Sequence, residues 1–136
     1  MEFTVRTTQR EEFIDMTAEV GRALADASAL AGADGIAVAF VPHTTAGVTI
    51  NENADPDVVI DMLAGLRRLV PRDASYRHVE GNSDAHTKAS LMGSSASIPV
   101  RDGRLALGRW QGIYLCEFDG PRTRRVSVTF IEGRTE

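Results

Sequence analysis

The chain has 136 residues, the length of one ordinary domain, and we expect a single domain over residues 1–136. Nineteen acidic side chains outnumber fifteen basic ones, so the net charge of −4 argues against nucleic-acid binding, in which neutralised phosphates supply most of the affinity. The longest apolar run, 36–41, is far shorter than the ~20 residues that span a bilayer, and the N-terminus has no signal-peptide pattern. We therefore expect a cytoplasmic protein without a membrane segment.

The N-terminal quarter of the chain predicts a strand followed by a helix. Residues 4–7 form the end of the strand, and Thr8 with Glu11 makes a capping-box pattern that starts a helix. Apolar residues then recur at helical spacing to about residue 30, before Gly32 and Gly35 end the helix. The predicted apolar face consists of Phe13, Met16, Val20, Leu24 and Ala27.

The middle of the chain predicts two extended segments and two helices. The run 36–41 is typical of a buried strand, and 44–50 continues as a second extended segment. Asp55 caps a helix that has proline at its first position and ends at Pro71. Asp84 is predicted to cap a short third helix, whose inner side carries Ala85, Ala89 and Met92 and whose other side carries His86 and Ser90.

The C-terminal part changes to a period of two, which is typical of strands. A hairpin is predicted around the turn Asp102-Gly103, because this dipeptide favours tight turns. Residues 113–118 and 126–131 form two further strands, and Cys116 in the first is predicted to be a buried, unreactive thiol. Strands at both ends with three helices between them predict an α+β sandwich whose sheet is mainly antiparallel or mixed.

Three histidines lie in polar, turn-like settings: His43, His78 and His86. Neutral imidazole is the commonest metal ligand and is also suited to proton transfer near neutral pH. Their spacing matches no local zinc signature, so the residues alone leave two interpretations open, a metal or catalytic site and three ordinary hydrogen-bonded histidines.

Two polar clusters stand directly before predicted helices. Asn51, Glu52 and Asn53 precede one helix, and Asn82 with Asp84 opens the next. Helix N-termini attract phosphate or carboxylate groups, although the same residues could serve only as caps.

Three further groups are candidates for ligand binding. Ser94 and Ser95 offer small side chains and backbone amides for a phosphate or oxyanion. Trp110 could stack on a heterocycle beside Gln111, or it could anchor a core. Arg124 belongs to a basic cluster that is either a solvated turn or a site for phosphate.

Taken together, the motifs resemble the YjbQ family, also known as UPF0047, over essentially the whole chain. The resemblance is carried by Pro42-His43-Thr44-Thr45-Ala46-Gly47, Asn51-Glu52-Asn53, Tyr76-Arg77-His78, Asn82-Ser83-Asp84-Ala85-His86, Gly108-Arg109-Trp110-Gln111-Gly112 and Glu117-Phe118-Asp119-Gly120-Pro121-Arg122. Two positions depart from the pattern: Thr87 replaces an apolar residue, and Arg109 replaces a small one and could alter the charge at the mouth of the site.

The resemblance implies an α+β sandwich that assembles as a homotrimer, with a polar, histidine-rich site near the subunit interfaces. It also implies a secondary thiamine-phosphate synthase, which joins an aminopyrimidine-methyl pyrophosphate to a thiazole phosphate and releases pyrophosphate. The residues that the resemblance assigns to this site are His43, Thr44, Thr45, Asn51, Asn53, His78, Asn82, Asp84, His86, Trp110 and Gln111.

With the resemblance, we expect His43, His86, Asp84 and Glu52 to act in catalysis. We expect a divalent ion at the three histidines, which favour zinc, whereas a pyrophosphate substrate would suit magnesium. Two alternatives remain open: a metal-dependent hydrolase of a small phosphorylated or ester substrate, and a non-catalytic trimer that binds a metal or ligand.

Overall fold

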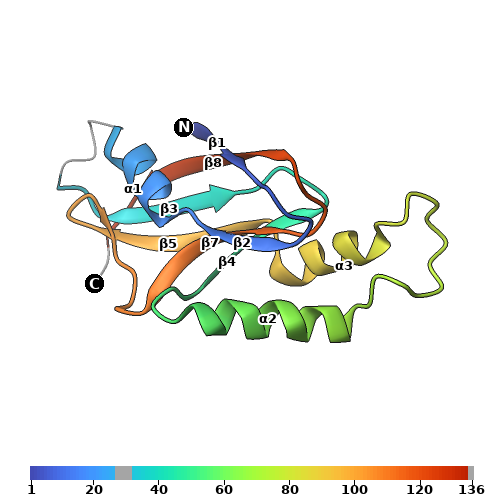
Figure 1. Cartoon of the computed structure of the whole chain (residues 1–136). Coiled ribbons are helices and arrows are strands. Elements are labelled where there is room, and N and C mark those ends of the chain that lie inside the picture. Colours follow the sequence, from blue (N-terminus) through green and yellow to red (C-terminus); the bar gives the residue numbers. More distant parts are fainter. Residues whose placement is uncertain (27–31, 135–136) are drawn as a thin grey trace.

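A computed structural model describes residues 1–26 and 32–134 of the chain. The described residues form two antiparallel sheets and three helices, which confirms the predicted α+β sandwich (Figure 1). Sheet A has the strand order β1 (Glu2–Arg6), β8 (Thr123–Glu132), β3 (Gly35–Phe40), β5 (Ser95–Arg101) and β6 (Arg104–Leu105). Sheet B has the order β2 (Glu12–Asp15), β7 (Gln111–Glu117) and β4 (Ala46–Glu52).

The main core lies between the two sheets, where alternate residues of each strand point inward. Ala37 and Ala39 of β3 are fully buried against Val48 of β4 and Leu115 of β7. Helix α1 (Thr17–Asp26) adds Val20 and Leu24 to the same core.

Sheet B is buried on both faces, because α2 (Pro56–Leu69) and α3 (Ser83–Met92) cover the side that faces away from sheet A (Figure 1). Leu66 of α2 and Ala85 and Ala89 of α3 pack there against Cys116 and Phe118. After Gln111 every residue of β7 is buried, and this includes the predicted inert thiol of Cys116, whose pKa burial raises.

Two of the connections between the sheets, which we call the crossovers, lie together at one end of the sandwich. Residues 41–45 carry it from β3 to β4, and residues 118–122 carry it from β7 to β8. The two crossovers touch, since the Phe118 backbone N–H donates to the Thr45 carbonyl at 3.2 Å. They therefore place their polar side chains side by side, next to the start of α3.

The helix predicted to start at the capping box is wrong in its first turns, because residues 12–15 form β2. Phe13 pairs with Cys116 of β7, and its ring lies 6.3 Å from that of Phe118, so burial in the sheet outweighs local helix preference. The helix begins instead behind Asp15, whose carboxylate accepts the Thr17 backbone N–H at 2.9 Å. Its predicted end near residue 30, together with Ala27, lies outside the described residues.

Asp84 does not cap α3, which corrects a second prediction. The N-cap position belongs to Asn82, and the Asp84 carboxylate is held by Arg10 and Lys88 instead. The predicted cap at Asp55 is confirmed, because its side chain accepts the Asp57 backbone N–H at 2.9 Å.

The turn at Asp102-Gly103 is confirmed, since both residues have the positive φ that a tight hairpin requires (49° and 71°). Among the described residues, no helix is long and apolar enough to cross a membrane.

Candidate functional site

Two adjoining cavities open where the crossovers meet α3. The first, which we call the crossover cavity, measures about 470 Å³ and is lined by Pro42, His43, Thr44, Thr45, His78, Glu80, Asn82, His86, Asp119, Arg122 and Arg124. The second, the helix-end cavity, measures about 420 Å³ and is lined by His43, Thr44, Ala46, His86, Ala89, Ser90, Gly93 and Ser94. His43, Thr44 and His86 belong to both, so they form a shared wall.

His43 is fixed in orientation by the backbone of β8. Its Nε2 accepts the Arg125 backbone N–H at 2.8 Å, which requires that nitrogen to be unprotonated and leaves the proton of the neutral ring on Nδ1. Burial, followed by the positive charges of Arg124 and Arg125, lowers the pKa of His43 and favours this neutral form. His43 thus offers its Nδ1–H as a donor at neutral pH.

Arg124 is held in place by a buried carboxylate that the sequence analysis did not single out. Glu117 accepts from Arg124 Nε at 2.9 Å and from its Nη2, and that Nη2 also donates to Thr45 Oγ1 at 2.8 Å. The third guanidinium nitrogen, Nη1, forms no hydrogen bond with the described residues, while Arg124 lines the crossover cavity. Arg124 is therefore held in one orientation at the wall of the crossover cavity.

Glu117 is fully buried, and both oxygens of its carboxylate accept hydrogen bonds. Besides Arg124, it accepts from Thr7 Oγ1 at 2.8 Å and from the backbone N–H groups of Phe118 and Asp119 at 3.0 and 3.1 Å. A lone carboxylate in the otherwise apolar run 113–118 was the signal in the sequence, since a buried charge needs a partner.

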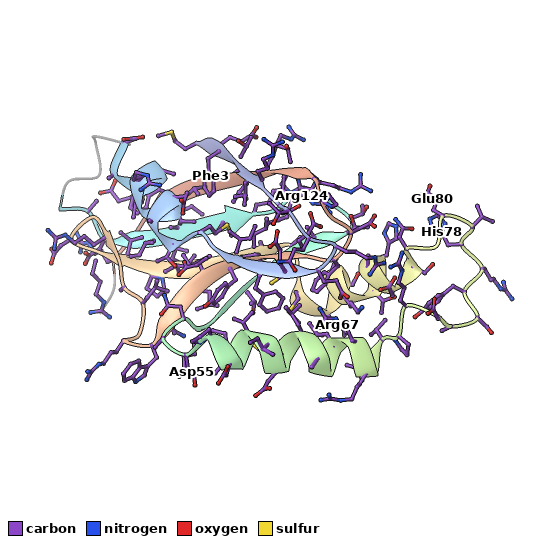
Figure 2. All side chains as sticks on the ribbon, viewed as in Figure 1. Phe3, Asp55, Arg67, His78, Glu80 and Arg124 are labelled. Atoms are coloured by element: carbon purple, nitrogen blue, oxygen red, sulfur yellow. The ribbon has the colours of Figure 1, made fainter. Side chains whose placement is uncertain are left out.

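His78 reaches the crossover cavity from the long connection between α2 and α3, in which residues 71–81 are all exposed. Figure 2 shows His78 and Glu80 on this loop, beyond the start of α3. The rings of His78 and His86 meet edge to face with their centres 5.6 Å apart, and His78 Nε2 lies 3.7 Å from the Glu80 carboxylate.

Asn82 connects the start of α3 to the second crossover. Its side-chain N–H donates to Asp119 at 2.9 Å, and Asp119 also accepts from Arg122 Nη2 at 3.0 Å. The Asn82 side-chain oxygen is buried and has no hydrogen-bond partner within the described part of the chain. Buried polar atoms are rarely left in this state, so this oxygen has an unused capacity to accept a hydrogen bond.

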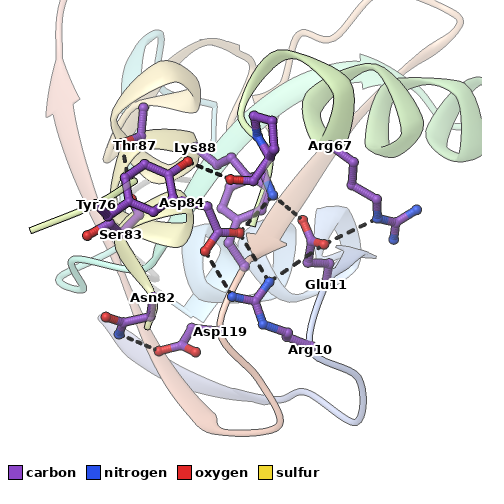
Figure 3. A network of polar contacts seen from close by, with 12 residues as sticks. Arg10, Glu11, Arg67, Tyr76, Asn82, Ser83, Asp84, Thr87, Lys88 and Asp119 are labelled. Atoms are coloured by element: carbon purple, nitrogen blue, oxygen red, sulfur yellow. Dashed lines mark hydrogen bonds and ion pairs between the residues drawn. The ribbon is translucent and has the colours of Figure 1, made fainter. Parts of the chain in front are cut away.

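Asp84 lines neither cavity, and its carboxylate belongs to the polar network shown in Figure 3. Its carboxylate accepts from Arg10 at 3.0 and 3.2 Å and from Lys88 at 3.0 Å, while Lys88 also donates to Glu11 at 3.0 Å. Burial by itself would raise the pKa of Asp84, but the hydrogen bonds and charges of Arg10 and Lys88 lower it. This network fastens α3 to the loop before β2 and so positions His86.

Five of the predicted site residues lie at the opposite end of sheet B. The end of β4 carries Asn51, Glu52 and Asn53, and next to them lie Trp110 and Gln111. A strand rises ~3.3 Å per residue, so this end lies about 20 Å from Ala46 at the start of β4. None of these five residues lines the crossover or the helix-end cavity, and Ser95 does not either, whereas Ser94 does.

Several of these side chains already have partners at that end. Asn53 Nδ2 donates to Asp15 at 3.3 Å, and the Gln111 side-chain oxygen accepts the Gly108 backbone N–H at 2.8 Å. The Arg109 guanidinium lies 4.7 Å from the centre of the Trp110 ring, so the residue that departs from the family pattern covers one face of the ring that was expected to stack on a ligand.

The three histidines do not fit a metal site as they are arranged. Within the described residues, no three His, Cys, Asp or Glu side chains gather closely enough to hold an ion. His43 in particular would have to release the Arg125 N–H before its Nε2 could coordinate. A divalent ion at His43, His78 and His86 stays a prediction, and we derive no step of the chemistry through it.

Comparisons with known proteins place this geometry in a family. The family model described as UPF0047 protein YjbQ-like matches residues 1–133. The UPF0047 protein YugU of Bacillus subtilis is 53% identical over 121 residues, which cover 88% of this chain and 89% of that protein. A UPF0047 protein of Methanocaldococcus jannaschii is 49% identical over 129 residues, which cover 95% of this chain and 91% of that protein. A solved YjbQ/UPF0047-family structure from Clostridium acetobutylicum is 53% identical, has a TM-score of 0.91, and covers 96% of this chain and 99% of that one.

Proposed function

The chain belongs to the YjbQ-like UPF0047 family, and from that premise we propose that it is an enzyme acting on a small phosphorylated substrate in the crossover cavity. The reaction we propose is thiamine-phosphate formation, in which an aminopyrimidine-methyl pyrophosphate and a thiazole phosphate are joined. The observation that carries the proposal is the convergence on one cavity of Arg122, Arg124 and the Nδ1–H of His43.

Departure of pyrophosphate is the step for which this cavity is best equipped. The bond between the methylene carbon and the pyrophosphate oxygen breaks, the oxygen keeps the electron pair, and the thiazole nitrogen forms the new bond to the carbon. Negative charge therefore develops on the leaving oxygen. Arg124, held rigid by Glu117, and the more exposed Arg122 would stabilise it without reorganising during the reaction.

The histidines would have different roles in this step. His43 cannot accept a proton at Nε2 while it holds the Arg125 N–H, so it would act as a neutral hydrogen-bond donor to the phosphate. His86, on the shared wall, is the group that would exchange a proton with the substrate. Asp84 and Glu117 would act as positioning residues, because neither carboxylate lines a cavity.

The proposal also includes the expected homotrimer, with a site near the subunit interfaces. The single chain provides the residues named above, and an assembled particle would carry one such site for each copy. Light scattering should give a particle of about three chain masses, since closed symmetric oligomers predominate among soluble assemblies.

The proposed function is tested by measuring thiamine-phosphate formation and pyrophosphate release together. We expect His43→Asn and His86→Asn each to reduce kcat/KM by about 100-fold, the typical effect of removing one group that stabilises developing charge or transfers a proton. Thr87→Asn, an exposed neighbour on α3 that lines neither cavity, is the matched control and should retain wild-type activity. Full activity in both histidine variants would contradict the assignment.

The alternative hydrolase is separated in the same assay by leaving out the thiazole acceptor. A synthase releases pyrophosphate only when the acceptor is present, whereas a hydrolase releases it from the pyrophosphate substrate alone. Equal release with and without the acceptor would therefore replace the transfer reaction with hydrolysis at the same cavity.

A further inference from the structure

We propose that the helix-end cavity is a second binding site, which takes an uncharged or cationic group that donates hydrogen bonds while an anion occupies the crossover cavity. The inference deepens the proposed function, on which it rests for the identity of the anion. It assigns the two parts of a bipartite ligand, or two separate ligands, to two chambers on either side of His43 and His86.

The first argument is that the cavity exists beside the anion-binding one and differs from it in charge. Its volume of about 420 Å³ lies within the range of small-molecule sites. The crossover cavity contains Arg122 and Arg124, whereas the helix-end cavity has no Lys or Arg in its lining, and its ionisable groups are the two shared histidines. A phosphate placed there would find no cation beyond those histidines.

The second argument concerns what the cavity offers to a ligand. Ser90 and Ser94 provide hydroxyl groups, and Ala46, Ala89 and Gly93 provide a small-residue surface against which a flat ring can lie. Helix α3 ends at Met92 with Gly93 as its C-cap, and a helix C-terminus carries partial negative charge. This charge disfavours anions and favours cationic or donor groups such as a ring amino group.

The third argument is that the cavity is rigid where α3 meets β4. A Cβ atom added at Gly47 would lie 2.7 Å from the Gly93 carbonyl oxygen and 3.1 Å from Met92 Cβ, so strand and helix are in close contact there. The Val48 backbone N–H donates to the same carbonyl at 3.0 Å. Closely packed backbone therefore forms the part of the cavity where α3 meets β4.

The shared wall explains why two chambers would be useful. Ligands in the two cavities would approach each other at His43, Thr44 and His86, which are the residues that touch both spaces. The bond that changes would then lie beside His86 and the His43 Nδ1–H, with the leaving phosphate on the arginine side. This arrangement suits group transfer between two moieties.

The test uses Ser90→Cys as a chemical reporter in the otherwise native chain. The only natural cysteine, Cys116, is fully buried with a raised pKa, so iodoacetamide should label the new exposed thiol alone. Thr87→Cys, exposed on the same helix but outside both cavities, is the matched control. Should Ser90→Cys fail to fold, Ser94→Cys serves as the second reporter.

Two probes are compared: the aminopyrimidine methanol that lacks phosphate, and inorganic pyrophosphate. We expect a near-saturating concentration of the aminopyrimidine to slow labelling at residue 90 by about tenfold, as mass action predicts. Pyrophosphate should leave that rate unchanged, and neither probe should protect Thr87→Cys. Protection of residue 90 by pyrophosphate, or its absence with the aminopyrimidine, would overturn the proposal.

The two proposals fail in distinguishable ways. If pyrophosphate does not bind to the wild-type protein in calorimetry, the proposed function fails, while aminopyrimidine protection still supports the second site. If pyrophosphate binds and the aminopyrimidine gives no protection, the second site alone is wrong.

Discussion

Replacing Glu117 with Gln should destabilise the fold more than any surface charge change, because it removes the partner of a buried arginine. The carboxylate accepts five hydrogen bonds, two of them from Arg124, and it is fully buried. The amide of Glu117→Gln keeps one acceptor oxygen but turns an NH₂ group toward donors at the other position. Some buried donors must then lose their acceptor.

The magnitude follows from the cost of breaking a buried pair. Removing one partner of such a pair typically costs about 3–5 kcal/mol, because the remaining charge stays buried without compensation. We therefore expect Glu117→Gln to lower the free energy of unfolding by about 3–5 kcal/mol, near the upper end for single substitutions. The Arg124 guanidinium should also lose its fixed orientation, which would weaken pyrophosphate binding.

Urea unfolding followed by circular dichroism, at one fixed protein concentration, measures this loss. Glu19→Gln is the control, since it removes a carboxylate from an exposed pair with Arg22 and should change stability by less than about 1 kcal/mol. If Glu117→Gln costs no more than this control, the buried pair does not hold the crossovers together, and the account of Arg124 as a pre-oriented group is wrong.

Three further predictions concern pH, packing and reactivity. NMR titration should place the pKa of His43 below its usual value of about 6.5, because burial and then the two neighbouring arginines disfavour the charged ring. The neutral ring's contribution to folding stability is therefore present above a pH of about 6.5 and is lost as the pH falls through the lowered pKa. A pKa at or above 6.5 would refute this prediction. Gly120→Ala should lower the free energy of unfolding in urea by about 1–3 kcal/mol, because the added Cβ would collide with the Gln9 carbonyl oxygen. Gly133→Ala is the control, since its Cβ would meet open space and should leave stability unchanged. Equal stability of the two variants would contradict the close packing at Gly120. Cys116 should resist iodoacetamide in the native protein and react in urea, as mass spectrometry can show, and fast labelling of the native protein would contradict its burial.

Most of the strands and one of the three helix starts illustrate what local patterns can predict. Asp55 followed by proline and the turn Asp102-Gly103 are determined within a few residues, so the sequence predicts them correctly. The capping box at Thr8 failed because the pairing of Phe13 with Cys116 joins segments about a hundred residues apart. Local propensity carries no information about such a contact.

The sequence indicated candidate site residues, but it could not show which of them share one cavity. His43, His78 and His86 come from three different segments and line one cavity, whereas Glu52 and Trp110 lie at the other end of sheet B. The sequence alone does not show how the strands pair, so it cannot show which loops meet at the same end of a sheet. The roles of Asp84 and Glu117 depend on partners far away in the chain, Arg10 in one case and Thr7 in the other, so their burial in ion pairs emerges only from the fold.

The most direct test of the central claim is a calorimetric titration of pyrophosphate into the wild-type protein and into Arg122→Met. Arg122 lines the crossover cavity and is half-exposed, so its removal should leave the fold intact. Arg67→Met, an equally exposed arginine on α2 outside both cavities, is the control. We predict that Arg122→Met weakens binding by about tenfold or more, since a charge-assisted hydrogen bond is worth about 1.5–3 kcal/mol, and that Arg67→Met binds like wild type. Equal affinity in all three proteins, or no binding to any of them, would contradict the claim that this cavity holds a phosphorylated substrate.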